Sequence, residues 1–316
     1  MTYLENYQAL AQALGWTMLH SVWQIGLIYV LFRLLRMLFR HNSAGYYGSL
    51  LAMTSSVVWA GLTFYATYRS RSGHSGANIP GIGPNPAIPV ETGHPAPPME
   101  ASSWEPALTW LESHAMVFGC LWCAGILFFS LRLLGGYWLS HRLRLRSLPV
   151  ADQQLSLLCR ELADGLGIRK PVQILESRFI QSPLTLGFWK PVVLFPVGLA
   201  LQLTPAQVEV LLLHELAHIR RYDYVVNLFQ MALEVCFFYH PLFRLLSREA
   251  DLCREFACDD LVLRHTGNPR LYATTLTEIK LYSVHPSIIP AMSAIGKSQF
   301  STRIQRIMGF SPKNGD

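Results

Sequence analysis

The stretch "LLLHELAHIRRYD", Leu211 to Asp223, contains two histidines four residues apart, with a glutamate directly after the first. On a helix, residues four apart share one face, so His214 and His218 can reach one metal ion while Glu215 projects beside them. The preceding "TPAQVEV" predicts the start of that helix, with a threonine cap followed by proline. This pattern is typical of a zinc hydrolase, in which two neutral imidazoles hold the ion and a carboxylate takes a proton from water.

A zinc site also needs a third protein ligand, because the five-residue pattern alone arises by chance on the order of a few times in a hundred chains of this length. The downstream stretch "SREADLCREFACDD" offers Glu255 and Asp259, four residues apart. Glu255 can complete a His₂Glu site, and Asp259 can accept the free ring N–H of a ligating histidine. Glu249 is the alternative ligand, and Cys258 is less suitable because a catalytic site keeps one position open. The other interpretation is a solvated acidic helix face.

The composition predicts a membrane protein. The 316 residues are 51% hydrophobic and only 15% charged. Three apolar runs, at about residues 14–36, 44–67 and 115–138, are each long enough to cross a hydrocarbon core of ~30 Å. The net charge of +6 comes with arginines that flank these runs, so we expect contact with membrane lipid and no direct binding of nucleic acid. No basic segment precedes the first run, so no cleaved signal peptide is expected.

The arginines also predict the orientation, because they follow the first and third runs and therefore mark the cytoplasmic side. The Gly/Pro-rich segment 68–114 then forms an extended extracytoplasmic loop, and the N-terminus lies outside. We expect two domains: a membrane domain, residues 1–140, and a cytoplasmic metallopeptidase domain, residues 141–316. The expected location is the bacterial inner membrane.

The second half of the chain predicts a mixed α and β domain. The segment "DQQLSLLCRELADGLGI" has helical periodicity, whereas Val172–Leu175 and Val192–Phe195 are short β-prone runs between prolines. The apolar run Val225–Leu246 is long enough to be mistaken for a fourth span. A single crossing there would separate the histidines from Glu255, so we expect this run to stay on one side of the membrane.

Taken together, "HELAHIRRYD", "FFYHPLFRLLSREADLCREFACDD", "SPLTLGFWKPVVLFP" and the apolar runs resemble the BlaR/MecR family of membrane metallopeptidases. Beside the three transmembrane helices that the apolar runs predict, the resemblance implies a gluzincin-type α+β domain, with His214, His218 and Glu255 as ligands of one zinc ion and Glu215 as catalytic acid/base. It also implies signal transduction by cleavage of a cytoplasmic protein, in antibiotic-sensing members a transcriptional repressor. By the same resemblance a peptide substrate adds to an edge strand, formed by Pro191, Val192, Val193, Leu194 and Phe195.

Several alternatives stay open at this point. The outer loop has no S-x-x-K signature and the sequence holds no sensor domain, so we do not expect β-lactam sensing. A membrane quality-control protease of the HtpX type and a non-catalytic receptor or scaffold are the competing functions, and a homodimer is the alternative to a single copy. Tyr239 and His240 are weaker candidates for oxyanion stabilisation, with a structural role before Pro241 as the alternative. Asp223 is expected to pair locally with Arg220.

Overall fold

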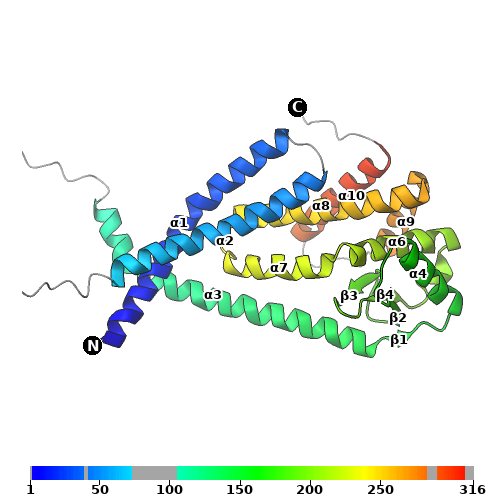
Figure 1. Ribbon diagram of the computed structural model, residues 1–316, viewed down its shortest axis with the longest axis horizontal. Coiled ribbons are helices and arrows are strands. Elements are labelled where there is room, and N and C mark those ends of the chain that lie inside the picture. Colours follow the sequence, from blue (N-terminus) through cyan, green and yellow to red (C-terminus); the bar gives the residue numbers. More distant parts are fainter. Residues whose placement is uncertain (1, 39–41, 73–104, 283–289, 310–316) are drawn as a thin grey trace, which may run out of the picture. The chain divides into compact units, whose positions relative to one another are not determined.

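The structure is a computed structural model that describes residues 2–38, 42–72, 105–282 and 290–309 (Figure 1). In this part of the chain it is mainly helical, with one small sheet. The elements follow in the order α1 Thr2–Leu38, α2 Asn42–Ser72, α3 Glu105–Arg146, β1 Leu148–Pro149, α4 Gln153–Gly165, β2 Gln173–Ser177, β3 Leu184–Leu186, β4 Val192–Pro196, α5 Leu199–Gln202, α6 Pro205–Arg220, α7 Asp223–Cys236, α8 Pro241–Thr266, α9 Pro269–Tyr282 and α10 Pro290–Ile307.

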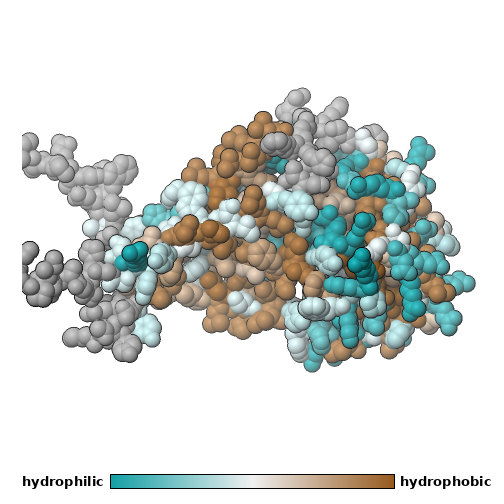
Figure 2. Space-filling view, in the orientation of Figure 1, coloured by the Kyte–Doolittle hydropathy of each residue, from teal (hydrophilic) through white to brown (hydrophobic). Residues whose placement is uncertain are grey.

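Three helices are long and apolar enough to cross a membrane: Ala9–Leu38, Gly45–Ser72 and Ser113–Arg146. Their large side chains face outward, as in Leu62 and Leu121, which are 63% and 61% exposed. Exposed apolar surface on such helices is what lipid contact requires. Figure 2 shows hydrophobic residues gathered over these helices and hydrophilic residues gathered over α4 and the strands. The three predicted spans are therefore confirmed, and the chain is a membrane protein.

The helices extend further than the sequence predicted. Residues 68–72 belong to α2 and residues 105–114 to α3, so these parts of the expected loop are helical. The rest of the predicted Gly/Pro-rich loop, residues 73–104, lies outside the described residues. α3 is continuous through residue 140, where the domain boundary was expected. Helices of this length carry polar ends beyond the hydrocarbon core, which needs only about 20 residues.

The chain forms two compact units, which we describe separately. The first comprises residues 1–31 and 52–128, which include the larger part of each of α1, α2 and α3. Small residues bring α1 and α3 together: a Cβ atom added to Gly15 would lie 2.0 Å from the carbonyl oxygen of Ala115. Gln24 Nε2 donates a 2.8 Å hydrogen bond to Thr63 Oγ1, between α1 and α2. Such packing is typical of helices that associate in lipid.

The second unit, residues 32–51 and 129–316, contains the sheet, whose strand order is β1-β2-β4-β3. β2 and β4 are parallel and correspond to the two predicted strands, whereas β3 pairs antiparallel with β4. The prediction that residues 191–195 form an edge strand is wrong. β4 has a neighbour on each side and is fully buried, so its backbone groups are already paired. The edge strand on this side is β3.

Helix α6 is the centre of this unit. Its N-terminus has the predicted Thr204 cap, with a reciprocal hydrogen bond from the Gln207 side chain and Pro205 in the first turn. α6 packs against α4, α7, α8, α9 and β3. The leucine run 211–213 is therefore buried on all sides, and the following histidines are held on a rigid element.

The apolar run Val225–Leu246 is broken into two helices. α7 has 14 residues, a length of about 21 Å, and is too short to cross a hydrocarbon core of ~30 Å. Its polar side chains pack against α8: the buried Gln230 donates hydrogen bonds to Ser247 Oγ and Asp251 Oδ1, at 2.6 and 2.8 Å. The run therefore does not form a single span, because its polar face has partners inside the domain. This agrees with the sequence-based prediction that the run stays on one side of the membrane.

Candidate metal centre

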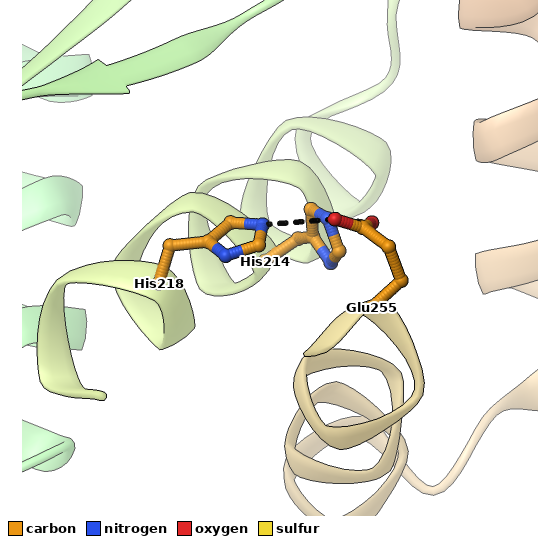
Figure 3. A group of neighbouring side chains, drawn as sticks. All are labelled: His214, His218 and Glu255. Carbon is orange, nitrogen blue, oxygen red and sulfur yellow. Dashed lines mark ion pairs between the residues drawn. The ribbon is translucent and has the colours of Figure 1, made fainter. Parts of the chain in front are cut away.

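Two histidines of α6 and a glutamate of α8 meet at one point (Figure 3). His214 Nε2 lies 3.6 Å from Glu255 Oε2, and His218 Nε2 lies 3.8 Å from Glu255 Oε1. All three side chains can offer one ligand atom within 4.8 Å of the others. The helical spacing of the histidines and the packing of α6 on α8 produce this arrangement.

The geometry of this group fits zinc. Tetrahedral zinc with bonds of ~2.0–2.1 Å places its ligand atoms about 3.3–3.5 Å apart, only slightly closer than the observed distances. Two imidazoles and one carboxylate are also the donor set of many hydrolytic zinc sites. Three protein ligands leave one position open for water or substrate, so this group is suited to catalysis.

A hydrogen-bond relay fixes the tautomer of His214. The hydroxyl of the buried Tyr272 lies 2.6 Å from Asp259 Oδ1 and 2.8 Å from His214 Nδ1. A phenol has one proton, and a carboxylate only accepts, so Tyr272 donates to Asp259 and accepts from the Nδ1–H of His214. Burial and the nearby Asp259 raise the pKa of Tyr272 well above its usual value, which keeps the phenol neutral. The lone pair of His214 is therefore on Nε2, the atom that faces Glu255.

Asp259 thus supports His214 through Tyr272 and not directly. Its Oδ1 lies 3.8 Å from His214 Nδ1, which is too long for a hydrogen bond. The sequence predicted that Asp259 accepts the ring N–H of a ligating histidine directly. This prediction is wrong, because the hydroxyl of Tyr272 of α9 bridges the two side chains. Sequence reasoning missed Tyr272, since nothing in its local sequence indicates the contact.

Asp223 supports the second histidine. His218 Nδ1 lies 2.9 Å from Asp223 Oδ2, so the imidazole donates from Nδ1 and Nε2 is the atom that can bind a metal once it is deprotonated. Asp223 Oδ1 also lies 3.5 Å from Arg221 Nε, so the expected pairing with Arg220 was wrong. Burial disfavours the charged imidazole, but the carboxylates of Asp223 and Glu255 outweigh burial and raise the pKa of His218.

Arg303 of α10 holds the third ligand. Its Nη1 lies 2.8 Å from Glu255 Oε2, while Nη2 and Nε contact both oxygens of Asp259 at 2.6 and 3.0 Å. Burial alone would raise the pKa of Glu255, but His214, Arg303 and His218 outweigh it and lower that pKa. The Glu255 carboxylate therefore stays ionised. Arg303 lies 48 residues beyond Glu255, and its role had no signal in the sequence.

Glu215 is buried beside the ligand group and is positioned by the sheet. Thr185 Oγ1 of β3 donates a 2.8 Å hydrogen bond to Glu215 Oε2. Glu215 lines a cavity of about 350 Å³ together with His214, His218 and Glu255. Glu215 and the three candidate ligands therefore line the same cavity.

A second group overlaps the first. His218, Asp223 and Cys258 also offer ligand atoms within 4.8 Å of one another. Here His218 would have to use Nδ1, which is already bonded to Asp223. Burial raises the pKa of Cys258 to about 11, so its thiol is protonated near neutral pH. The first group is therefore the better metal site, and the alternative ligand Glu249 instead pairs with Arg36 at 3.2 Å.

Tyr239 and His240 do not belong to the residues that line the cavity of the metal centre. His240 is buried at the N-terminus of α8, where its Nδ1 accepts a 3.3 Å hydrogen bond from the Phe243 backbone N–H. This position supports the structural interpretation of the pair over oxyanion stabilisation.

The fold and the site together define a class: helices that can span a membrane, joined to a domain whose paired histidines and distant glutamate converge as in a metallopeptidase. The comparison with known families agrees. Residues 96–307, more than half of the chain, match the model of the BlaR1 peptidase M56 family. The chain belongs to this family of peptidases.

Individual relatives are more distant. The chain is 26% identical over 147 residues to "Regulatory protein BlaR1" from Bacillus licheniformis. This match covers 46% of this chain and 24% of the relative. It is 25% identical over 96 residues to "Methicillin resistance mecR1 protein" from Staphylococcus aureus and from Staphylococcus epidermidis. Each of these matches covers 30% of this chain and 16% of the relative. The matched segment thus spans about a quarter or less of the length of these relatives.

Proposed function

We propose that the protein is a zinc-dependent endopeptidase of the bacterial inner membrane that cleaves a cytoplasmic protein, with its N-terminus outside. The observation that carries the proposal is the convergence of His214, His218 and Glu255 beside Glu215. The printed names of the relatives concern regulation and antibiotic resistance. They support a role in signalling, with a transcriptional repressor as the substrate that we infer.

The chemistry is hydrolysis of a peptide bond. When bound, zinc supplies Lewis acidity that polarises the scissile carbonyl and lowers the pKa of water. Glu215 takes a proton from the attacking water and transfers it to the nitrogen of the leaving amine, so the C–N bond breaks and one water is consumed. Because Thr185 donates to Oε2, we expect Oε1 of Glu215 to carry this proton.

The substrate backbone, in this proposal, pairs with β3. Among the described strands β3 is the edge next to the metal centre, and Leu184 and Thr185 line the cavity. Main-chain hydrogen bonds to an edge strand bind an extended peptide with little dependence on its sequence. Thr185, whose hydroxyl positions Glu215, therefore lies in the strand that would receive the peptide.

The quality-control alternative is less consistent with the structure, because it needs two membrane crossings between His218 and Glu255. The helix between the two ligand helices, α7, has only 14 residues. At ~1.5 Å per residue it spans about 21 Å, less than one crossing.

The test compares cytoplasmic protein fragments in cells that carry the wild type, Glu215→Ala or Glu209→Ala. Glu209 is an exposed residue on the same helix and serves as the matched control. We expect fragments that are present with the wild type and the control and absent with Glu215→Ala, while the purified Glu215→Ala protein keeps its zinc. Fragments that persist in the Glu215→Ala cells would contradict the proposal.

A further inference from the structure

A second and larger cavity adjoins the metal centre. It has a volume of about 730 Å³ and is lined by α3, from Phe129 onward, and by β3, α7 and α8. This volume is typical of ligand sites, which range from ~300 to ~1,000 Å³. α3 and α7 lie side by side here (Figure 1), with Phe129 stacked on Phe238 at 5.0 Å between ring centroids. The two cavities share four lining residues, Leu184, Thr185, Tyr224 and Asn227.

The larger cavity is strongly basic. Arg132 of α3 and Arg244 and Arg248 of α8 line it, against one acidic residue, Glu234. Among the described residues none of these three arginines forms an ion pair or a side-chain hydrogen bond. Glu234 already accepts a short hydrogen bond from Ser247 Oγ. The cavity therefore holds guanidinium groups that are available to a ligand.

The arrangement of the arginines differs from that of scattered surface charges. Arg244 and Arg248 are four residues apart, so they share one face of α8. Arg132 is the single charged residue in the stretch 115–137 of α3. The lining also contains apolar side chains of α7, namely Leu228, Met231 and Val235. Such a lining favours a ligand that combines negative charge with apolar groups.

We propose that this cavity is a substrate subsite, which selects peptides with acidic side chains next to the scissile bond. The inference rests on the proposed peptidase function. β3 lines both cavities, and the side chains of an added strand alternate between its two faces. When a peptide pairs with β3, its scissile bond therefore lies at the metal centre. A neighbouring side chain of the same peptide then enters the basic cavity. This continuity favours a peptide over a lipid headgroup.

The expected preference is moderate, because Arg244 and Arg248, the two arginines on α8, are exposed. Ion pairs of exposed side chains contribute about 0.2–1 kcal/mol each, which corresponds to factors of about 1.4 to 5. Two such pairs predict that an acidic peptide is cleaved about 2- to 25-fold more efficiently than its amide analogue. The preference decreases with added salt.

The experiment uses the full chain in detergent, loaded with zinc, and a synthetic peptide library whose cleavage products are read by mass spectrometry. Cut peptides are then resynthesised with Asp, Asn or Lys at each position that flanks the cleaved bond, and kcat/KM is measured. We expect Asp to be preferred at one flanking position by the wild type, and Lys by the double variant Arg244→Glu/Arg248→Glu. The control variant Arg264→Glu, on the same helix outside the cavity, should keep the preference for Asp.

The outcomes separate the two proposals. The subsite proposal is overturned if the wild type cleaves without a charge preference, or if the double variant retains the preference of the wild type. Neither result contradicts the proposed peptidase function. No cleavage by the zinc-loaded wild type contradicts the proposed function itself. Arginine-dependent binding to phosphatidylglycerol vesicles over phosphatidylcholine vesicles, with unchanged peptide selectivity, would identify a lipid headgroup site and overturn the subsite. The zinc content of the double variant shows that it has folded.

Discussion

The hydroxyl of Tyr272 offers a sharp test of the relay that holds His214. The substitution Tyr272→Phe removes one oxygen atom from a fully buried side chain and leaves its apolar packing in place. The Nδ1–H of His214 then loses its acceptor, and Asp259 loses one of its donors. An unsatisfied buried polar group costs about 1–3 kcal/mol, and outer partners of metal ligands contribute about 10- to 100-fold to metal affinity. We therefore expect the Kd for zinc to rise by about 10- to 100-fold.

The assay is competition for zinc against a chelator, with purified protein in detergent. Thr275→Val is the matched control, because it also removes a buried hydroxyl from α9, one that donates to the backbone oxygen of Leu271 and does not contact the metal centre. The control should bind zinc like the wild type, although it loses some stability. Equal Kd values for Tyr272→Phe and the wild type would refute the relay.

Three further predictions concern the other partners of the centre. Arg303→Met should weaken zinc binding about 10-fold, with partial recovery in Arg303→Lys, because the cation aligns Glu255; equal Kd values in all three proteins would contradict this. Thr185→Val should lower kcat about 2- to 10-fold at full zinc content, because Glu215 loses one hydrogen bond; an unchanged kcat counts against it. The raised pKa of His218 means that zinc must displace a proton, so zinc affinity should fall from about pH 8 to about pH 6; a flat titration would exclude that competition.

The sequence was sufficient for features that depend on local patterns. The Thr204 cap, the spacing of His214 and His218 and the three apolar spans each follow from neighbouring residues. The sequence also predicted that the run 225–246 packs within the domain, because its polar residues need partners there, but it did not predict the division of the run into two helices. These properties arise within one helix or one segment, which is why periodicity and capping signals detect them.

Features that depend on tertiary contacts could not be read in this way. β3 has three residues, too few for a recognisable alternation, so β4 was mistaken for the edge of the sheet. Tyr272 and Arg303 come from helices that follow the ligand segment and reach the centre only after α9 and α10 pack on α8. Asp259 was correctly placed near the histidines by its spacing, but the side chain between them was not predictable from that spacing.

In the proposed function, His214, His218 and Glu255 bind one zinc ion. The most direct measurement is the zinc content of purified wild-type protein beside the variants Glu255→Ala and Cys258→Ala, since Cys258 belongs to the overlapping group. We predict about one zinc per chain for the wild type and for Cys258→Ala, and loss of zinc from Glu255→Ala. Full zinc content in Glu255→Ala, or its loss in Cys258→Ala, would contradict the account.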